Sequence, residues 1–417
     1  MTRAEPNART EQPANPFRPG NGVAPPYLAG RDALLIAFDE FLAERPLHAN
    51  WALTGLRGTG KTVLLGEFAA RAEHAGWLTL QRELGERHRD DERLAEAIIE
   101  DADALLRRAN MLAGVGQALE HGARFLRPRR VTVGEVGYEP AYAERSAAPA
   151  EQMRQALSEL DAAAGDGRPR GVLLLYDEAH LLADDRARER YPLSDLLAAL
   201  GAVQRAEPRV RVILSGLPTL SLNLKRARTY AERMFRHPVV GNLERGDAWD
   251  ALGIPLATSG RRFALSVVGD IVDQTGGYPY FLQFFAAYVW RSVSSNEVSL
   301  ADYRTVEPAL LHELDLAFFD DRFEIASPTE QLILEAMARE AGSVRLPRLR
   351  QHLPTQGGMD LLLRRLVERG LIYRAGRGAY DFALPLFRDY LTRRAKLTEL
   401  TRSVRTVAAA EAPAVVE

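Results

Sequence analysis

The sequence has 417 residues, a formal net charge of −2, no cysteine and 46% apolar residues. This length is enough for two or three domains, and the apolar content is enough to fill their cores. The near-neutral charge excludes a protein that attracts nucleic acid or anionic membrane over its whole surface. Without cysteine there are no disulfides and no thiolate metal sites. No signal-peptide core or membrane span is recognisable, so we expect a cytoplasmic protein with no membrane partner.

Residues 1–24 are rich in Pro, Asn, Arg and Glu and offer almost nothing to bury, so we predict a disordered tail. Over 25–242, short apolar runs alternate with helical stretches, which is typical of an α/β domain with a parallel sheet. Strands are expected over 51–54, 77–82, 171–176 and 210–215. Between the second and third strands lies a long insertion, with a helix near 91–109 and a β-prone piece around 130–142, to which we assign no role.

Gly55–Thr62 spells the complete phosphate-binding loop, G-x-x-x-x-G-K-T. It falls between the first strand and a helical stretch over 63–73, which is the turn that the motif requires. There, glycines let backbone N–H groups surround a polyphosphate at the positive end of the new helix. Lys61 is expected to reach the β- and γ-phosphates of ATP, and the Thr62 hydroxyl to ligate Mg²⁺. The nucleotide-binding residues expected here are Gly55, Arg57, Gly58, Thr59, Gly60, Lys61 and Thr62, and the alternative is a chance surface turn.

The apolar run over 171–176 ends in two acids, Asp177 and Glu178. The carboxyl end of a central parallel strand faces the ligand crevice, so these side chains are expected beside the phosphate loop. Asp177 is predicted to hold Mg²⁺ directly or through water, and Glu178 to activate water as the general base. The alternative is a pair of acids capping a surface strand. Asp177–His180 also spells the box of a helicase class, but helicases need a second motor domain, and this chain turns helical after residue 243.

The strand over 210–215 ends in Ser215, which is followed by Gly216. A hydroxyl at this position can bond the attacking water or the γ-phosphate from the flank opposite the loop. The alternative is a plain strand-ending turn, since Ser215–Pro218 is also a common turn sequence.

From residue 243 onward helical signals replace strand signals, and we predict a helical domain over 243–325. Its helices are expected over 247–252, 265–275, 280–293 and 300–319. A third domain is predicted over 326–397, beginning with the capping box Ser327–Glu330. Two further helices over 345–352 and 358–369 and a hairpin over 371–383 complete a winged-helix pattern. Residues 398–417 are expected to form a tail.

The third domain is basic although the whole chain is not. Over 327–396 there are 13 Lys and Arg side chains against 7 Asp and Glu, an excess of 6 positive charges. Such asymmetry favours an anionic partner, and double-stranded DNA is the candidate. The candidate contacts are Arg364, Arg365, Arg369, Arg374 and Arg377. Asp360 and Glu368 share the second of these helices, and winged helices also dock proteins, so a protein partner remains the alternative.

Taken together, these motifs resemble those of the AAA+ P-loop ATPases, in the branch shared by archaeal replication initiators and STAND-type switch ATPases. The similarity covers roughly 27–395 and extends to uncharacterised bacterial members. The resemblance implies that Tyr27–Asp32, which includes Arg31, flanks adenine, and that Ser215 is the sensor residue of the family. It also implies that Gly276–Leu282, with Tyr278 and Pro279, belongs to a helical lid that packs over the nucleotide.

Two features of the sequence concern the arginines that contact the γ-phosphate in the family. Most members follow the lid proline with an arginine that senses the γ-phosphate, but Tyr280 stands here, which favours a switch over a fast motor. In the family, arginines in the region 227–236 can reach a neighbouring subunit's γ-phosphate, so Arg233 and Arg236 are the candidates in a homo-oligomer. The alternative is a solvated helix with Arg228, Glu232 and Arg236 spaced for i,i+4 pairing.

The resulting hypothesis is a Mg²⁺-dependent ATPase that couples its nucleotide state, ATP or ADP, to a nucleic-acid or protein partner. The alternative from a different class is a STAND-like signalling or defence scaffold with slow or no hydrolysis and a protein partner. Intact Glu178 favours hydrolysis.

Overall fold

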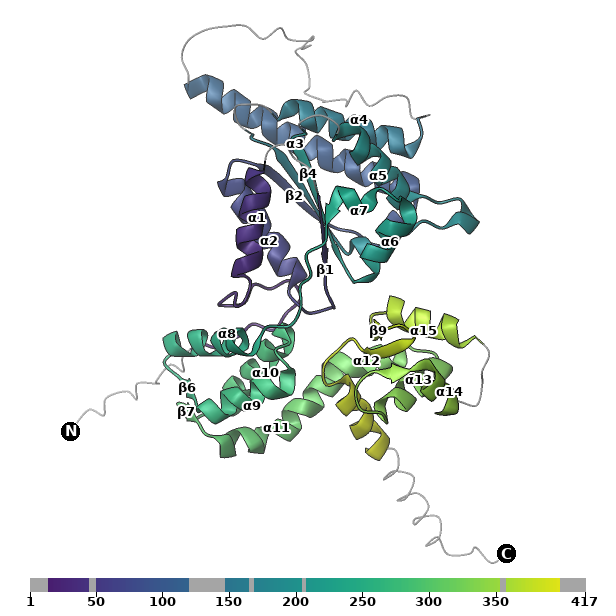
Figure 1. Ribbon diagram of the computed structural model, residues 1–417. Coiled ribbons are helices and arrows are strands. Elements are labelled where there is room, and N and C mark those ends of the chain that lie inside the picture. The colour runs from purple at the N-terminus through teal and green to yellow at the C-terminus, as the bar shows by residue number, and fades with distance from the viewer. Residues whose placement is uncertain are drawn as a thin grey trace, which may run out of the picture. The chain divides into compact units, whose positions relative to one another are not determined.

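The computed structural model describes residues 14–44, 50–119, 147–164, 169–204, 208–352 and 358–397. They divide into two compact units (Figure 1). The sheet unit consists of Arg31–Gly55 and Gly60–Gly241, and the helical unit of the residues up to Gly30, Leu56–Thr59 and the chain from Asn242. The β-prone piece expected around 130–142 and the tail expected over 398–417 lie outside the described residues.

The sheet unit is built on five parallel strands in the order β2-β3-β4-β1-β5. Their bounds are Asn50–Thr54 for β1, Leu78–Glu83 for β2, Val172–Asp177 for β3, Val210–Gly216 for β4 and Phe235–Arg236 for β5. The four predicted strands are confirmed, each within one residue of the observed ends. The two-residue β5 was not predicted, because so short a segment carries no periodicity.

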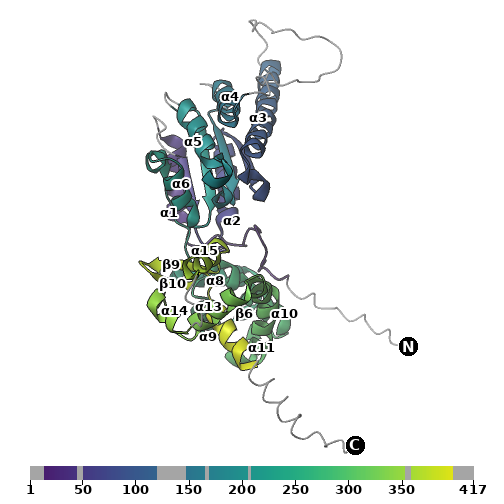
Figure 2. The same cartoon turned by 90° about the vertical axis from the view of Figure 1, so that its right-hand side faces the viewer.

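Helices cover both faces of this sheet, as Figures 1 and 2 show. On one face lie α1 (Asp32–Ala43) and α2 (Lys61–His74), where Trp51 of β1 packs edge-on against Phe38 and Phe68 at centroid distances of 5.9 and 5.7 Å. The other face is covered by α3 (Asp91–Leu119), α4 (Pro149–Ala163) and α5 (Pro192–Val203). Two further helices, α6 (Thr219–Ala227) and α7 (Ala231–Met234), follow β4, and short 3-10 turns cover Glu86–Arg89, Ala179–Leu181 and Arg186–Arg188. The predicted helix near 91–109 is thus part of the longer α3.

The helical unit begins with α8 (Arg245–Thr258), α9 (Leu265–Thr275), α10 (Pro279–Ser292) and α11 (Leu300–Leu314). A π-helical turn (η4, Asp315–Phe319) joins α11 to α12 (Asp320–Glu324), and a small parallel pair joins β6 (Arg262–Phe263) to β7 (Glu297–Val298). The C-terminal elements are α13 (Pro328–Ala338), β8 (Val344–Arg345), α14 (Leu346–His352), α15 (Met359–Glu368), β9 (Ile372–Gly376), β10 (Ala379–Phe382) and a helix over 387–397. Here the antiparallel sheet has the order β8-β10-β9.

The core of the helical unit is continuous. Buried side chains run without a break from α8 through α12 into the C-terminal helices and strands. Phe319 illustrates the connection, because its ring lies 5.8 Å from Phe281 of α10 and 5.4 Å from Phe387 of the last helix. The segments predicted as two domains, 243–325 and 326–397, therefore share one hydrophobic core. No helix among the described residues combines the length and the apolar character needed to cross a membrane.

The prediction of a disordered tail over 1–24 is wrong for residues 14–24. Phe17 is 3% exposed and packs against Phe263 and Trp290, each at a centroid distance of 6.4 Å. On either side of it, the Asn15 amide donates to the carbonyl of Ala287, and the backbone N–H of Arg18 donates to the Gln283 side chain. Average composition hides such an anchor, because one aromatic residue and two polar contacts suffice to fix a short segment.

Candidate functional site

The strand order determines which chain segments meet at the carboxyl edge of the sheet. β1 leads into the phosphate loop, β3 ends in the predicted acid, and β4 pairs with both of them. The carboxyl ends of parallel strands lie at one edge, so the start of α2 and the ends of β3 and β4 come together there. The first and the last of these three motifs are more than 100 residues apart in the sequence. Only the order of the strands in the sheet brings them together.

Asp177 is the centre of this edge and is 3% exposed. Its Oδ2 accepts a hydrogen bond of 2.5 Å from the Thr62 hydroxyl, and its Oδ1 accepts one of 2.8 Å from the Ser215 hydroxyl. The backbone N–H of Glu178 donates to the same Oδ1 at 2.9 Å. These three donors fix the orientation of the carboxylate. We call Thr62, Asp177 and Ser215 the carboxylate cluster.

The phosphate loop has the backbone that its glycines predict. Gly58 and Gly60 have φ values of 73° and 92°, in the left-handed region that other residues rarely adopt. α2 begins at Lys61 directly after Gly60, so its first N–H groups face the loop. Lys61 is 6% exposed and donates from Nζ to the carbonyl of Gly55 at 3.1 Å. The Thr59 hydroxyl donates to the carbonyl of Leu56 at 2.9 Å, which stabilises the turn internally.

Glu178 adopts an unusual backbone conformation directly after the cluster. Its φ is 54°, which costs a residue with a Cβ about 1–2 kcal/mol. The chain that follows is held by Asn223 of α6, whose side-chain amide donates to the carbonyls of His180 and Leu182 at 3.0 and 3.2 Å. A Cβ on Gly216 would lie 2.8 Å from the backbone nitrogen of His180, so β4 must end in glycine here. The surroundings thus hold Glu178 in place, with its Oε2 3.7 Å from the Nδ1 of His180.

A divalent cation of the Mg²⁺ type fits the donors of the carboxylate cluster. Mg²⁺ prefers hard oxygen ligands and usually shares its shell with substrate phosphates, so one carboxylate and one hydroxyl suffice. Thr62 and Asp177 supply this pair. Within the described ranges, no group of three or more His, Asp or Glu side chains could hold a metal ion by itself. The donor set therefore suits a cation that arrives with a phosphate.

The lid residues expected from the sequence lie beside the tip of the phosphate loop, within the helical unit. Tyr278 precedes α10, is fully buried, and donates its hydroxyl hydrogen to the carbonyl of Arg57. Burial raises the pKa of Tyr278 far above its usual range, so the hydroxyl remains a donor. Pro279 occupies the first turn of α10, where its missing N–H costs no hydrogen bond. A Cβ on Gly58 would collide with the Tyr278 hydroxyl, so the close approach requires glycine.

Arg31, expected near adenine, is 9% exposed and donates to the carbonyl of Gly241 at 2.8 Å. This contact joins the first and last residues of the sheet unit. Arg31 therefore has a structural partner in addition to any ligand, and its guanidinium fixes the point at which the chain leaves the sheet unit.

The two candidate trans-acting arginines lie in different environments. Arg236 belongs to β5 opposite Trp51, near the amino end of β1, and forms an ion pair of 2.6 Å with Glu44. Arg233 lies on α7, is exposed and forms no ion pair with any described residue. The alternative of one solvated helix is wrong, because Arg228 ends α6 with an extended backbone and Arg236 is in a strand.

One polar network near the site was not predicted. Asp101 of α3 is 2% exposed, and its carboxylate accepts hydrogen bonds of 2.6–3.0 Å from Arg82 of β2. The hydroxyl of Tyr176 donates to Asp101 at 3.1 Å, one residue before Asp177. Burial raises the pKa of Asp101, and the guanidinium of Arg82 counteracts this shift. No spacing rule links these three residues, so sequence inspection had no signal for the network that joins the insertion to β3.

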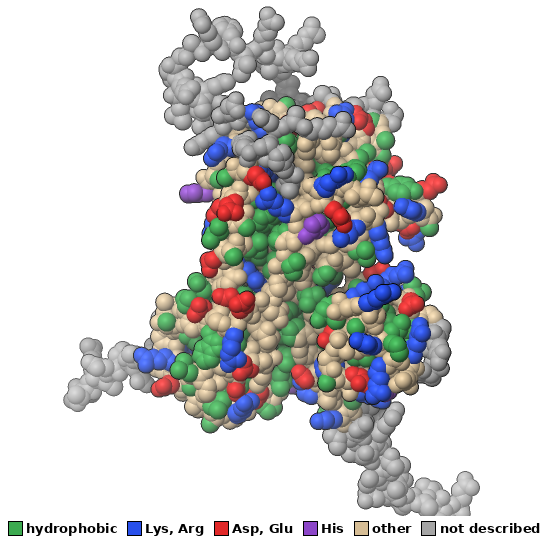
Figure 3. Space-filling model, in the orientation of Figure 1, with side chains coloured by type: hydrophobic (Ala, Val, Ile, Leu, Met, Phe, Trp, Pro, Cys, Tyr) green, Lys and Arg blue, Asp and Glu red, His purple; other side chains and the backbone are tan. Residues whose placement is uncertain are grey.

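The basic C-terminal residues divide into paired and unpaired arginines. Arg369 donates to the carboxylate of Glu330 at 2.7 Å and to the carbonyl of Ile325 at 3.1 Å. Glu330 is fully buried and also accepts from the backbone N–H of Ser327, which closes the predicted capping box. On β8, α15 and the hairpin, in contrast, these arginines are exposed and form no ion pair with any described residue: Arg345, Arg364, Arg365, Arg374 and Arg377. We call these five the arginine surface, and Figure 3 shows basic side chains gathered over the part that carries α15 and β9.

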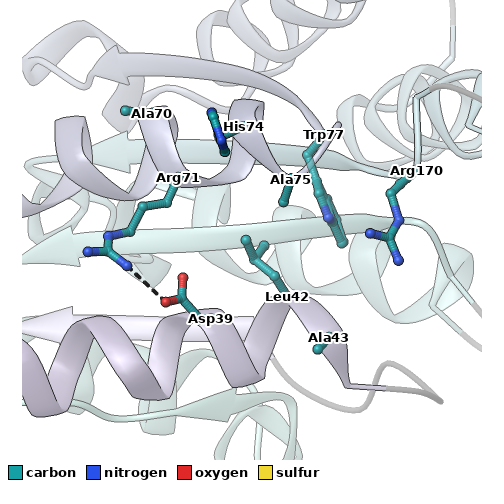
Figure 4. A pocket seen from close by; sticks show the side chains of 9 residues that line it. All are labelled: Asp39, Leu42, Ala43, Ala70, Arg71, His74, Ala75, Trp77 and Arg170. Carbon is teal, nitrogen blue, oxygen red and sulfur yellow. Dashed lines mark hydrogen bonds and ion pairs between the residues drawn. The ribbon is translucent and has the colours of Figure 1, made fainter.

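A pocket of about 580 Å³ lies at the other edge of the sheet (Figure 4). Its lining includes the ends of α1 and α2 together with Trp77 and Arg170, which precede β2 and β3. Arg71 points across it to Asp39 and forms an ion pair of 2.8 Å, so one cation of the lining is already neutralised. The lining does not include any residue of the carboxylate cluster, so the pocket takes no part in the site described above.

Comparisons with known proteins agree with this architecture. The family described as Domain of unknown function (DUF8462) matches residues 316–391. No curated protein sequence matches the chain. A Walker-type ATPase of Pyrococcus abyssi is 16% identical, with 88% of this chain and 96% of that chain covered and a TM-score of 0.59. The Orc2 protein of Aeropyrum pernix, solved in ADPNP-ADP complexes, is 13% identical, with coverages of 91% and 98% and a TM-score of 0.51. These similarities confirm the predicted α/β fold with a central parallel sheet, which this chain shares with both solved structures.

Proposed function

We propose that this protein is a Mg²⁺-dependent ATPase that uses its nucleotide state to control binding of a partner. The observation that carries the proposal is the carboxylate cluster, in which Asp177 is joined to Thr62 and Ser215 at the end of the phosphate loop. An isolated loop motif or an isolated acid is common, but their meeting at one edge of a parallel sheet supports nucleotide chemistry. A protein of similar fold, from Aeropyrum pernix, was solved with ADPNP and ADP, which fits this proposal.

The residues of the chain have separate roles in the proposed reaction. The loop N–H groups and Lys61 would bind the phosphates, and the Thr62 hydroxyl and the Asp177 carboxylate would hold Mg²⁺. When bound, this cation would neutralise negative charge on the phosphates. Glu178 would take the proton of the attacking water, since it follows the cluster directly and is held in a fixed backbone conformation. Ser215 would position the carboxylate of Asp177 and thereby stabilise the arrangement.

The test of hydrolysis is the Glu178→Gln variant, which keeps the size of the side chain and removes the base. We expect turnover to fall by about 10²–10⁴-fold while ATP affinity changes little. The control is Glu189→Gln, because Glu189 is an exposed acid at another left-handed position outside the site. A wild-type protein that binds ATP without turnover would favour the alternative of a scaffold or slow signalling switch with a protein partner.

We further propose that the partner is double-stranded DNA, bound by 327–396 in the manner of a winged helix. In the described part of this segment, three helices, α13 to α15, precede the hairpin, and the arginine surface places five cations that form no ion pair with a described residue on β8, α15 and the hairpin. Exposed cations of this kind suit the phosphate backbone, which makes most of the contacts in nonspecific DNA binding. The described residues of α15 and the hairpin include no Asn, Gln, Ser or Thr that could accompany these arginines in reading bases, so we expect shape and charge to dominate.

DNA binding is tested by reversing the charge of Arg364, Arg365 and Arg377 and measuring affinity across a salt series. For each DNA phosphate that the variant no longer neutralises, the slope of log K against log salt should fall in magnitude by about 0.9. A matched control is the reversal of Arg107, Arg226 and Arg262, three exposed arginines outside 327–396 that form no ion pair with a described residue. Binding that ignores salt, or is absent, would instead favour a protein partner.

A homo-oligomer with a trans-acting arginine is the last part of the proposal. Arg233 is favoured over Arg236, because Arg236 already pairs with Glu44 whereas Arg233 is exposed and forms no ion pair in the described chain. Arg233→Ala should lower turnover by about 10³-fold or more, and only at concentrations at which light scattering detects the oligomer. Turnover independent of concentration and of Arg233 would show that each chain acts alone.

A further inference from the structure

Two arginine contacts join α3 to β2, one toward each end of the strand. Toward the carboxyl end, Arg82 of β2 binds the carboxylate of Asp101 through Nε and Nη2 at 2.6–3.0 Å. Toward the amino end, Arg108 of α3 donates to the carbonyl of Thr79 at 2.8 Å and to the carboxylate of Glu73 at 3.2 Å. All of these residues belong to the sheet unit, so their mutual arrangement is that of one compact body.

The contact at the carboxyl end extends to β3, the strand that carries Asp177. Tyr176 is 1% exposed, and its hydroxyl donates to Oδ2 of Asp101 at 3.1 Å. Arg82 and Tyr176 are partners in the parallel pairing of β2 with β3, so the two strands reach Asp101 from adjacent positions. We call Arg82, Asp101 and Tyr176 the α3 network.

The α3 network lies one residue before the carboxylate cluster. Tyr176 and Asp177 are consecutive residues of β3, so their side chains point to opposite faces of the sheet. Tyr176 packs in the core on the α3 side, whereas Asp177 bonds Thr62 at the start of α2. The carbonyl of Asp177 accepts a hydrogen bond of 3.0 Å from the backbone N–H of Leu84, which follows β2. The end of β3 is thus held from its β2 side by this bond and from its α3 side by the Tyr176 hydroxyl.

The carboxylate cluster and the α3 network fix different parts of Asp177. Thr62, Ser215 and the N–H of Glu178 bond its carboxylate oxygens and so set the rotation of the side chain. The α3 network holds the preceding residue and so sets the place from which this side chain extends. Both matter, because a misplacement of about 1 Å can lower a rate by about 100-fold.

The chemistry of the α3 network suits positioning better than it suits stability. Asp101 is 2% exposed, so its pairing with Arg82 stabilises the fold little beyond the cost of removing both charges from water. Hydrogen bonds are directional, however, and this carboxylate accepts bonds from both Arg82 and Tyr176 in a single orientation. Apolar side chains of the same volume would fill the space without fixing a direction.

We propose that Arg82, Asp101 and Tyr176 are positioning residues, which hold Asp177 where its carboxylate binds the Mg²⁺ that accompanies ATP. This inference rests on the proposed function. Arg82 fixes Asp101, Asp101 fixes the hydroxyl of Tyr176, and Tyr176 fixes the adjoining backbone of Asp177. The inference also gives a role to α3, which lies in the insertion between β2 and β3, because α3 supplies the central residue of the network.

The test is the Tyr176→Phe variant of the full chain, which keeps the buried ring and removes the hydroxyl. ATP affinity is measured by calorimetric titration in excess Mg²⁺ and again in EDTA, and the ratio of the two affinities gives the Mg²⁺ enhancement. We expect this enhancement to fall by about 3-fold to 10-fold, as for the loss of one hydrogen bond, while affinity in EDTA changes by less than about 2-fold. An unchanged enhancement would overturn the inference.

Arg108→Gln is the matched control, because it breaks the other contact between α3 and β2. It should leave the Mg²⁺ enhancement unchanged, whatever its effect on the urea midpoint. An equal loss in Arg108→Gln would mean that any loosening of α3 has this effect, and the specific role of the α3 network would be refuted.

A second variant, Asp101→Asn, guards against a folding defect, and urea unfolding checks that every variant is folded under the conditions of the titration. Asn has one acceptor oxygen, which Arg82 is expected to occupy, so the bond to Tyr176 should be lost and the Mg²⁺ enhancement should fall here as well. Adding Tyr176→Phe to this variant should lower the enhancement no further, and additive losses would show that Tyr176 does not act through Asp101. A wild-type chain that binds ATP equally well in Mg²⁺ and in EDTA, or not at all, would contradict the proposed function instead.

Discussion

The carboxylate cluster and the arginine surface differ in how the fold holds their charged side chains. In the cluster, Asp177 is buried and held by three hydrogen bonds, and the next residue adopts a strained backbone. On the arginine surface, five cations are exposed and none forms an ion pair with a described residue. Chemistry at one phosphate requires atoms that are fixed to within fractions of an ångström. Attraction of a polyanion requires only charge on a rigid frame.

The largest expected effect tests this contrast directly. Asp177→Asn keeps the shape of the side chain but removes the charge that would hold Mg²⁺, so hydrolysis should fall by about 10⁴-fold. Reversing Arg364, Arg365 and Arg377 should leave hydrolysis without DNA within about 2-fold, because these residues lie outside the cluster. Steady-state phosphate release measures both. Equal losses in the two variants would mean that the two regions do not differ as we describe.

The next largest expected effect concerns the stability of the helical unit. Phe17→Ala should destabilise this unit by about 3–5 kcal/mol, as expected for the removal of a buried aromatic ring. Val23→Ala is the control, since Val23 is 44% exposed and should change stability by less than about 0.5 kcal/mol. Hydrogen exchange resolved by peptide should place the loss in α9 and α10 and leave β1 and β4 protected. A loss shared by all strands would show that the units unfold together.

A smaller effect separates Arg369 from the rest of the basic residues. Arg369→Ala leaves the buried carboxylate of Glu330 without its cation, and we expect a loss of about 1–2 kcal/mol, reduced because Arg369 is partly exposed. Arg365→Ala should change stability by less than about 0.5 kcal/mol and weaken DNA binding instead. Urea unfolding measures the stability of each variant, and a DNA titration measures its affinity for DNA. Identical behaviour of the two arginines would remove the distinction between paired and surface arginines.

The smallest effect concerns the tip of the phosphate loop. Tyr278→Phe keeps the buried ring and removes the hydrogen bond to Arg57, which should weaken nucleotide binding by about 0.5–1.5 kcal/mol. Tyr303→Phe is a suitable control, because Tyr303 is also buried in the helical unit and its hydroxyl bonds Gln274. Titration with ADP detects the change. A larger loss for Tyr303→Phe would indicate a general effect on the unit.

Much of the candidate site could be located in the sequence because its motifs are local. Gly55–Thr62 and Asp177–Glu178 are motifs of consecutive residues next to strands, and four strands were placed within one residue of their observed ends. The capping box at Ser327 and Glu330 was equally readable, and the structure contains both of its hydrogen bonds. Backbone turns, caps and strand patterns depend on neighbours in the chain, so the amino-acid order by itself determines them.

Other features depend on contacts between distant segments. Phe17 appears in a polar segment and becomes an anchor only because Phe263 and Trp290 leave a place for its ring. Arg369 is a candidate DNA contact by its position in the sequence, but the fold pairs it with Glu330. The order of residues thus determined the phosphate loop and its acids, whereas tertiary structure decided which charges are neutralised, because pairing depends on distances in space.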